Sequence, residues 1–142
     1  MRCDEKALIS VYAADEIGEH KLQYQRYHTL IFYLAKVESF KFPDYSFSPF
    51  FWGKAGNAMI SRQLARDTGV LCAKGYLTLN SPAVSITSPG KQFAAGAIPR
   101  FEEDEGRGFD SLKQAVESTL KSQRENISEF LRVCYRAYVG EE

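Results

Sequence analysis

The first candidate for chemistry is a glycine–lysine pair in the stretch VSITSPGKQFA, residues 84–94. A phosphate-binding P-loop needs G-x-x-x-x-G-K followed by Ser or Thr, because successive backbone N–H groups wrap the phosphates and the hydroxyl holds magnesium. Here Ser85 stands where the first glycine is needed, and Gln92 follows Lys91 in place of the hydroxyl. The stretch therefore predicts the start of a helix, with Pro89 in its first turn, and no nucleotide site.

Metal and catalytic sites are not indicated either. His20 and His28 are eight residues apart, whereas a helical metal pair needs a spacing of about four, so we expect surface or capping roles for both. The acidic run at residues 102–105 is interpreted as a solvated linker, with a cation site as the less favoured alternative. Motifs such as G-x-S-x-G and H-E-x-x-H are missing from the sequence. We expect no metal, no cofactor and no enzymatic activity.

Basic side chains in the middle of the chain are the better candidates. The 142-residue chain has a net charge of zero, but residues 20–100 carry ten basic and three acidic side chains, a net charge of +7 between acidic ends. Arginine and asparagine make bidentate contacts with base edges in the major groove, and lysine meets phosphates. The candidate DNA-binding residues are Lys54, Asn57, Ser61, Arg62, Arg66, Lys74 and Lys91. The alternative is a solvated face on a domain that binds only protein.

The elements that would position these residues follow from apolar spacing and turn residues. Helices are predicted from Asp4 to Gly18, over 21–37 and over 57–67, and the runs 70–79 and 83–88 predict a β-hairpin around a turn at 80–82. Three helices followed by a hairpin is the order of a winged helix-turn-helix, an α+β fold. Gly69 is the expected end of the third helix. The connection over residues 38–56 is longer than the usual helix-turn-helix turn.

The sequence therefore predicts three parts: a winged-helix domain over 1–95, an acidic linker over 96–109 and a C-terminal helical extension over 110–142. The extension is one helix or two, since Asn126 and Glu129 resemble a capping box, and we expect it to form a homodimer. Aromatic side chains in the long connection are interpreted as packing residues, with single-strand stacking as the alternative. They are Phe47, Phe50, Phe51 and Trp52.

Composition places the chain among soluble, cytoplasmic proteins. Its three cysteines are Cys3, Cys72 and Cys134, which are far apart, include no C-x-x-C pair and are interpreted as reduced thiols. No apolar run approaches the length that a membrane span needs. The N-terminus also lacks the apolar segment of a signal peptide.

Two stretches carry a resemblance to a known family. HKLQYQRYHTLIFYL, from residue 20, and YSFSPFFWGKAGNAMISRQLARDTGVL, from residue 45, resemble the YwgA-type transcription regulators and their SocA-type antitoxin relatives, over about residues 20–95. The resemblance implies a winged-helix fold with a DNA-binding or protein-binding role. The chain departs from the family's Tyr-Gly-Pro-hydrophobe-Ser loop, because residues 52–56 read Trp-Gly-Lys-Ala-Gly.

The combined expectation is sequence-specific binding of double-stranded DNA by a dimeric transcriptional regulator. The alternative is a protein-interaction module without DNA contact, such as an antitoxin-like or adaptor subunit. A small enzyme without a recognisable motif is a third, weaker alternative.

Overall fold

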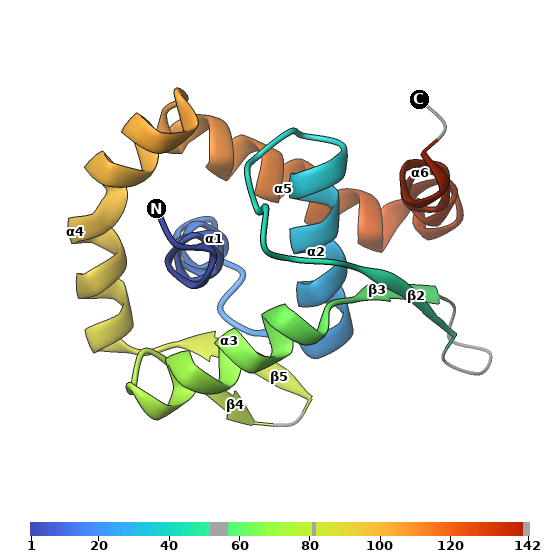
Figure 1. Cartoon of the computed structure of the whole chain (residues 1–142). Coiled ribbons are helices and arrows are strands. Elements are labelled where there is room, and N and C mark those ends of the chain that lie inside the picture. Colours follow the sequence, from blue (N-terminus) through green and yellow to red (C-terminus); the bar gives the residue numbers. More distant parts are fainter. Residues whose placement is uncertain (52–56, 81, 141–142) are drawn as a thin grey trace.

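The computed structural model describes residues 1–51, 57–80 and 82–140 as a mixed α+β fold of six helices with small antiparallel sheets (Figure 1). The α+β class predicted from the sequence is confirmed. The elements are α1 (Cys3–Glu16), β1 (Leu22–Gln23), α2 (Tyr24–Lys36), β2 (Ser48–Phe51), β3 (Asn57–Ile60), α3 (Arg62–Ala73), β4 (Leu77–Asn80), β5 (Ala83–Ile86), α4 (Ser88–Glu105), α5 (Phe109–Glu125) and α6 (Ile127–Val139).

Helix α1 lies at the centre of the molecule, where Figure 1 views it nearly end-on and surrounded by other helices. It contacts α3, α4, α5 and strand β5. Burial is not confined to one face of this helix, because Ala7, Leu8, Ile9 and Ala13 are all fully buried. A helix contacted on all sides is a core helix, so α1 supplies the surface against which the rest of the chain packs.

The hairpin predicted after the third helix is present as β4 and β5. An additional strand, β1, pairs antiparallel with β5 through Leu22 opposite Val84, which gives the sheet order β1-β5-β4. The helix predicted over residues 21–37 includes Leu22, but α2 begins only at Tyr24. The Tyr24 N–H donates to the Pro82 carbonyl at 2.7 Å, so the start of α2 is attached to the hairpin.

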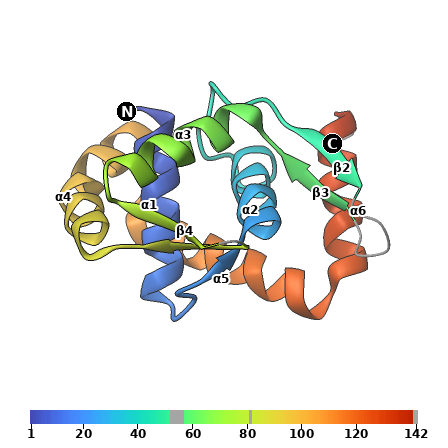
Figure 2. The same ribbon diagram turned by 90° about the horizontal axis from the view of Figure 1, so that it is seen from below.

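The connection between α2 and α3 contains a two-stranded ribbon, β2–β3, which packs on α2 through β3 and lies beside α6 (Figure 2). The prediction of a helix over 57–67 is therefore wrong at its start, because residues 57–60 form β3. This strand is attached to α2 by a hydrogen bond from the Met59 N–H to Thr29 Oγ1 at 3.1 Å. A side-chain acceptor on a neighbouring helix is a tertiary contact that local spacing does not reveal.

The end of α3 also differs from the prediction. Gly69 lies inside α3, which continues to Ala73, and the predicted strand begins only at Leu77. The helix ends before Gly75, whose φ of 80° is the left-handed conformation that glycine adopts without strain.

The start of α4 explains the Ser-Pro-Gly-Lys stretch. Thr87 caps the helix by accepting the Gly90 N–H at 3.0 Å, and Pro89 lies in the first turn as predicted. A Cβ atom on Gly90 would lie 2.1 Å from the Tyr76 carbonyl oxygen. Glycine is required here because helix and hairpin backbones pass in direct contact.

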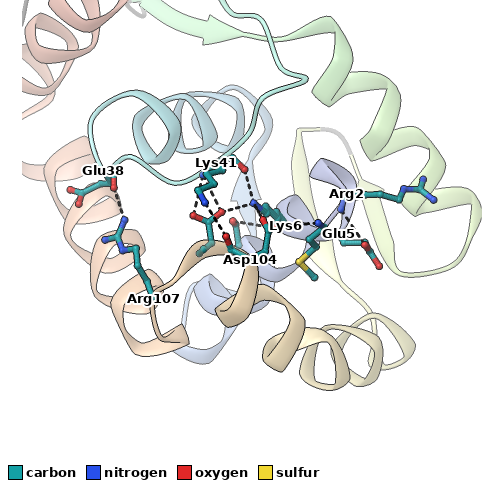
Figure 3. Close-up of polar contacts among 10 residues, drawn as sticks. Arg2, Glu5, Lys6, Glu38, Lys41, Asp104 and Arg107 are labelled. Carbon is teal, nitrogen blue, oxygen red and sulfur yellow. Dashed lines mark hydrogen bonds and ion pairs between the residues drawn. The ribbon is translucent and has the colours of Figure 1, made fainter.

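The acidic stretch predicted as a solvated linker is instead part of the folded core (Figure 3). Helix α4 continues to Glu105, and the buried Lys6 ammonium lies 2.6 Å from Glu105 Oε2 and 2.5 Å from Asp104 Oδ2. Lys6 also donates to the Lys41 carbonyl at 2.9 Å. Although burial alone would lower the pKa of Lys6, these two carboxylates raise it above its usual value, so the lysine stays charged.

The C-terminal segment consists of two helices that meet at Asn126, whose side chain makes no capping hydrogen bond. Helix α5 contacts α1 and α2, and α6 contacts α2 and β3. The buried face of α6 places Phe130 and Cys134 in a small apolar cluster with Phe32 and Met59. Burial raises the pKa of the Cys134 thiol to about 12, so it is an unreactive packing group.

Candidate nucleic-acid interface

Helix α3 presents one continuous exposed stripe to solvent. Its exposed positions follow spacings of three and four residues, as expected for one face of a helix: Arg62, Arg66, Gly69, Val70 and Ala73. Arg62 and Arg66 occupy the first half of the helix. Neither forms an ion pair with any residue that the structure describes.

The opposite face of α3 is fixed in the core. Leu64, Thr68 and Leu71 are buried, and Thr68 Oγ1 lies 2.8 Å from the Tyr27 hydroxyl of α2. Burial raises the pKa of Tyr27, so this hydroxyl is neutral and available for hydrogen bonding. These contacts determine which side of α3 faces solvent.

One flank of α3 is held by the long connection. The Tyr45 hydroxyl donates to Asp67 Oδ2 at 2.7 Å, and the Ser46 N–H donates to Gln63 Oε1 at 3.1 Å. The only carboxylate of α3 is therefore occupied by Tyr45, while its two arginines are exposed. The exposed stripe is cationic as a result.

Ser61 does not lie on the exposed face, contrary to the prediction. It is fully buried and forms the N-cap of α3, because its Oγ accepts the Leu64 N–H at 3.1 Å. Its own N–H donates to His28 Nδ1 at 3.1 Å. Ser61 therefore positions the start of α3 against α2 and cannot contact a ligand.

His28 was expected at the surface or in a cap, and this prediction is wrong. The imidazole is fully buried, with the rings of Tyr24 and Tyr27 centred 4.6 and 5.6 Å away. Burial lowers its pKa from 6.5 to about 4, so the ring is neutral at physiological pH and Nδ1 is free to accept from Ser61. Nε2 then carries the proton and has no hydrogen-bond partner among the described residues. His20, by contrast, is exposed as expected.

The remaining candidate residues are dispersed. Asn57 begins β3 and not the third helix, and its side chain lies outside the described residues, as does Lys54. Lys74 is exposed at the C-cap of α3, next to the hairpin. Lys91 is also exposed, but its ammonium lies 3.2 Å from Asp15 of α1, so its charge is already balanced.

Asp15 also accepts from His20, whose Nδ1 lies 2.6 Å away. Although burial alone would raise the pKa of Asp15, the hydrogen bonds from His20 and Lys91 lower it, so the carboxylate remains ionised. Lys91 is therefore exposed but has a carboxylate partner, whereas Arg62 and Arg66 form no ion pair among the described residues.

The start of α2 adds two basic side chains that are not among the candidates predicted from the sequence. Arg26 is exposed in the first turn of this helix, and Lys21 is exposed just before β1. The signal in the sequence was a basic residue, Arg26, close to the predicted start of the second helix. Both residues lie in the segment joined to the hairpin through Tyr24.

Metal binding and base stacking by aromatic side chains are two other kinds of candidate site. Among the described residues, no group of three or more His, Cys, Asp or Glu side chains could hold a metal ion, and no helix is long and apolar enough to cross a membrane. Phe47 packs edge-on against Phe32, with ring centroids 5.3 Å apart, which is a packing role. The side chains of Phe50, Phe51 and Trp52 lie outside the described residues.

Comparison of the chain with protein-family models, with curated proteins and with solved structures gives no significant match.

Proposed function

We propose that the chain binds double-stranded DNA through the exposed stripe of α3, as a winged helix-turn-helix protein. The observation that carries the proposal is the pair of exposed arginines, Arg62 and Arg66, one turn apart in the first half of α3 and without an ion-pair partner in the described part of the chain. Recognition helices contact bases mainly through residues near their N-terminus.

The order of elements supports this proposal. The succession α1, β1, α2, α3 and the hairpin β4–β5, with sheet order β1-β5-β4, is compatible with a winged helix in which the hairpin is the wing. The ribbon β2–β3 accounts for the long connection between α2 and α3. The family resemblance implies the same fold and suggests transcriptional regulation.

The position of Arg62 supports a role outside folding. It is the first residue of α3, where the partial positive charge of the helix N-terminus disfavours a cation. The first turn of α3 contains no acidic residue. Basic character here does not stabilise the helix, whereas it is suited to binding an anion.

The stripe offers distinct contacts along the groove. Either arginine can make a bidentate contact with guanine, and the exposed Val70 side chain can make an apolar contact with the methyl group of thymine. Lys74 is placed to meet a phosphate beside the wing. The wing strands themselves, residues 77–80 and 83–86, carry no Lys or Arg, so phosphate contacts there would come from hydroxyl and backbone groups.

The uncharged wing favours one alternative, a protein-interaction module that has the same fold without DNA contact. In that case the exposed Val70 and Leu79 would belong to a protein interface. Co-purification of a stoichiometric protein partner in place of nucleic acid would support this alternative.

The test is a titration of a labelled mixed-sequence duplex with the pure chain, at low and at physiological salt. We expect affinity to fall steeply with salt, because neutralised phosphates release counterions. Selection of a preferred site would follow. Arg62→Ala should then cost about 1–3 kcal/mol at that site and relax preference at one position.

Arg100→Ala is the matched control, since Arg100 is exposed on α4 and paired with Glu5. Failure of the wild-type chain to bind at low salt would overturn the DNA proposal and leave the protein-interaction alternative.

A further inference from the structure

Residues 38–46, which we call the strap, run from the end of α2 to the flank of α3 and are fixed at both ends. At the first end, the Arg107 guanidinium donates to the Glu38 carbonyl at 2.6 Å (Figure 3). The Lys41 N–H donates to both carboxylate oxygens of Glu105, at 3.0 and 3.2 Å. This end of the strap is therefore attached to the end of α4 and to the turn that follows it.

Tertiary contacts also determine the backbone course of the strap. Ser39 has a φ of 62°, in the left-handed region that residues other than glycine seldom adopt. The next residue, Phe40, is buried, and its ring stacks on Phe101 with the centroids 6.2 Å apart. The Arg107 guanidinium lies 3.8 Å from the centroid of the same ring. These contacts make the strap a fixed support and not a loose connection.

The second end of the strap contacts α3 beside its two exposed arginines. Gln63 and Asp67 directly follow these arginines in the sequence. The Ser46 N–H donates to Gln63 Oε1 at 3.1 Å, and the Tyr45 hydroxyl donates to Asp67 Oδ2 at 2.7 Å. The Tyr45 ring is buried and stacks on Phe42, with the centroids 5.8 Å apart. Each exposed arginine is therefore next to a residue that the strap holds.

The rotation of α3 about its own axis matters for base recognition. Of the twelve residues of this helix, the buried ones are Leu64, Thr68 and Leu71. A rotation of about 10° moves an atom about 6 Å from the helix axis by about 1 Å. A bidentate base contact needs two donor–acceptor distances of about 2.7–3.2 Å, so a shift of this size weakens it. Non-specific attraction to phosphates depends mainly on charge and tolerates the same shift.

We propose that the strap sets the rotation of α3 and that Tyr45 is a positioning residue, which increases selectivity for a DNA sequence without contacting DNA. This inference rests on the proposed function. Loss of the bond between Tyr45 and Asp67 leaves every charge of α3 in place. Its effect is therefore on discrimination between sequences and not on non-specific affinity.

The test compares two variants of the full chain. Tyr45→Phe removes the hydrogen bond and keeps the ring. Asp67→Asn is the matched control, because its amide oxygen can still accept from Tyr45 while the negative charge is lost. Each protein is titrated with the duplex that the wild type selects from a random-sequence pool, and with a mixed-sequence duplex.

Tyr45→Phe should bind the selected duplex about tenfold more weakly, the loss of roughly one bidentate base contact, and the mixed-sequence duplex within about twofold of wild type. Asp67→Asn should bind both duplexes more tightly and keep the wild-type ratio of the two affinities. This ratio separates positioning from stability, because a partly unfolded variant loses affinity for both duplexes by the same factor.

Amide hydrogen exchange without DNA provides a second measurement. We expect α3 to exchange faster in Tyr45→Phe than in the wild type or Asp67→Asn. Equal exchange of α3 in the two variants would overturn the inference. An unchanged affinity ratio in Tyr45→Phe, or an equal fall of the ratio in Asp67→Asn, would overturn it while leaving DNA binding intact. Failure of the wild-type chain to bind either duplex would instead overturn the proposed function, and the inference with it.

Discussion

The buried imidazole of His28 makes a specific prediction about stability and pH. In the unfolded chain this histidine takes up a proton near its ordinary pKa of 6.5, whereas in the folded protein it does so only near pH 4. Between these values the unfolded state binds more protons than the folded state, so stability falls as the pH is lowered. Well above pH 6.5 the imidazole is neutral in both states and has no effect on pH dependence.

The magnitude follows from the size of the difference. A separation of about 2.5 pKa units, at about 1.4 kcal/mol per unit, corresponds to about 3 kcal/mol of unfolding free energy lost between pH 6.5 and pH 4. Protonation would also place a hydrogen on Nδ1, which now accepts the Ser61 N–H at the start of α3. Folding stability and the position of α3 therefore depend on the same neutral ring.

Urea unfolding at pH 7, 5.5 and 4, followed by circular dichroism at 222 nm, measures the effect. The matched variant is His28→Asn, because the asparagine oxygen can replace Nδ1 as acceptor but does not titrate. Protonation of carboxylates that are paired in the folded state also lowers the free energy of unfolding in acid, but it does so equally in both proteins. We expect the wild type to lose about 3 kcal/mol more than His28→Asn between pH 7 and pH 4. Equal losses in the two proteins would refute the argument.

Four other substitutions test the remaining structural conclusions. Lys74→Ala should weaken binding to all DNA sequences alike and reduce the slope of log affinity against log salt by about one, measured in the same titration. Lys6→Met should destabilise the fold by about 3–5 kcal/mol in urea unfolding, because it leaves buried Glu105 without its cation; a loss below 1 kcal/mol would contradict the described burial. Ser61→Ala should cost about 1 kcal/mol through loss of the α3 cap, with no selective change at any base position. Gly90→Ala should lower the thermal midpoint, since a Cβ would meet backbone 2.1 Å away; an unchanged midpoint would show that helix and hairpin can move apart.

Local patterns predicted the parts of the fold that are determined locally. The hairpin β4–β5 was recognised from alternating residues around a turn, and α4 from Pro89 in its first turn. For residues 110–142 the sequence left open one helix or two, and the structure has two helices that meet at Asn126. In each case neighbouring residues in the sequence supply the contacts.

Errors arose where distant residues decide the outcome. Residues 57–60 have a helical pattern, but pairing with β2 and the acceptor on Thr29 make them a strand. The acidic stretch looked solvated because its cation, Lys6, is about a hundred positions away in the sequence. Within the candidate interface, Arg62 and Arg66 are exposed as predicted. Ser61 was also predicted to be exposed but is buried, because α3 begins at Arg62 and Ser61 is its N-cap.

The central position of α1 has a consequence for synthesis on the ribosome. This helix is synthesised before α4 and α5, which cover it, and before the carboxylates that balance Lys6, all of which lie after residue 87. At about 5–20 residues per second, about 5–20 s separate the synthesis of Lys6 from that of Glu105. During that interval the side chains of α1 that become buried in the fold have no covering elements, and Lys6 lacks both of its carboxylate partners. The domain therefore completes its core only once α4 and α5 have been synthesised.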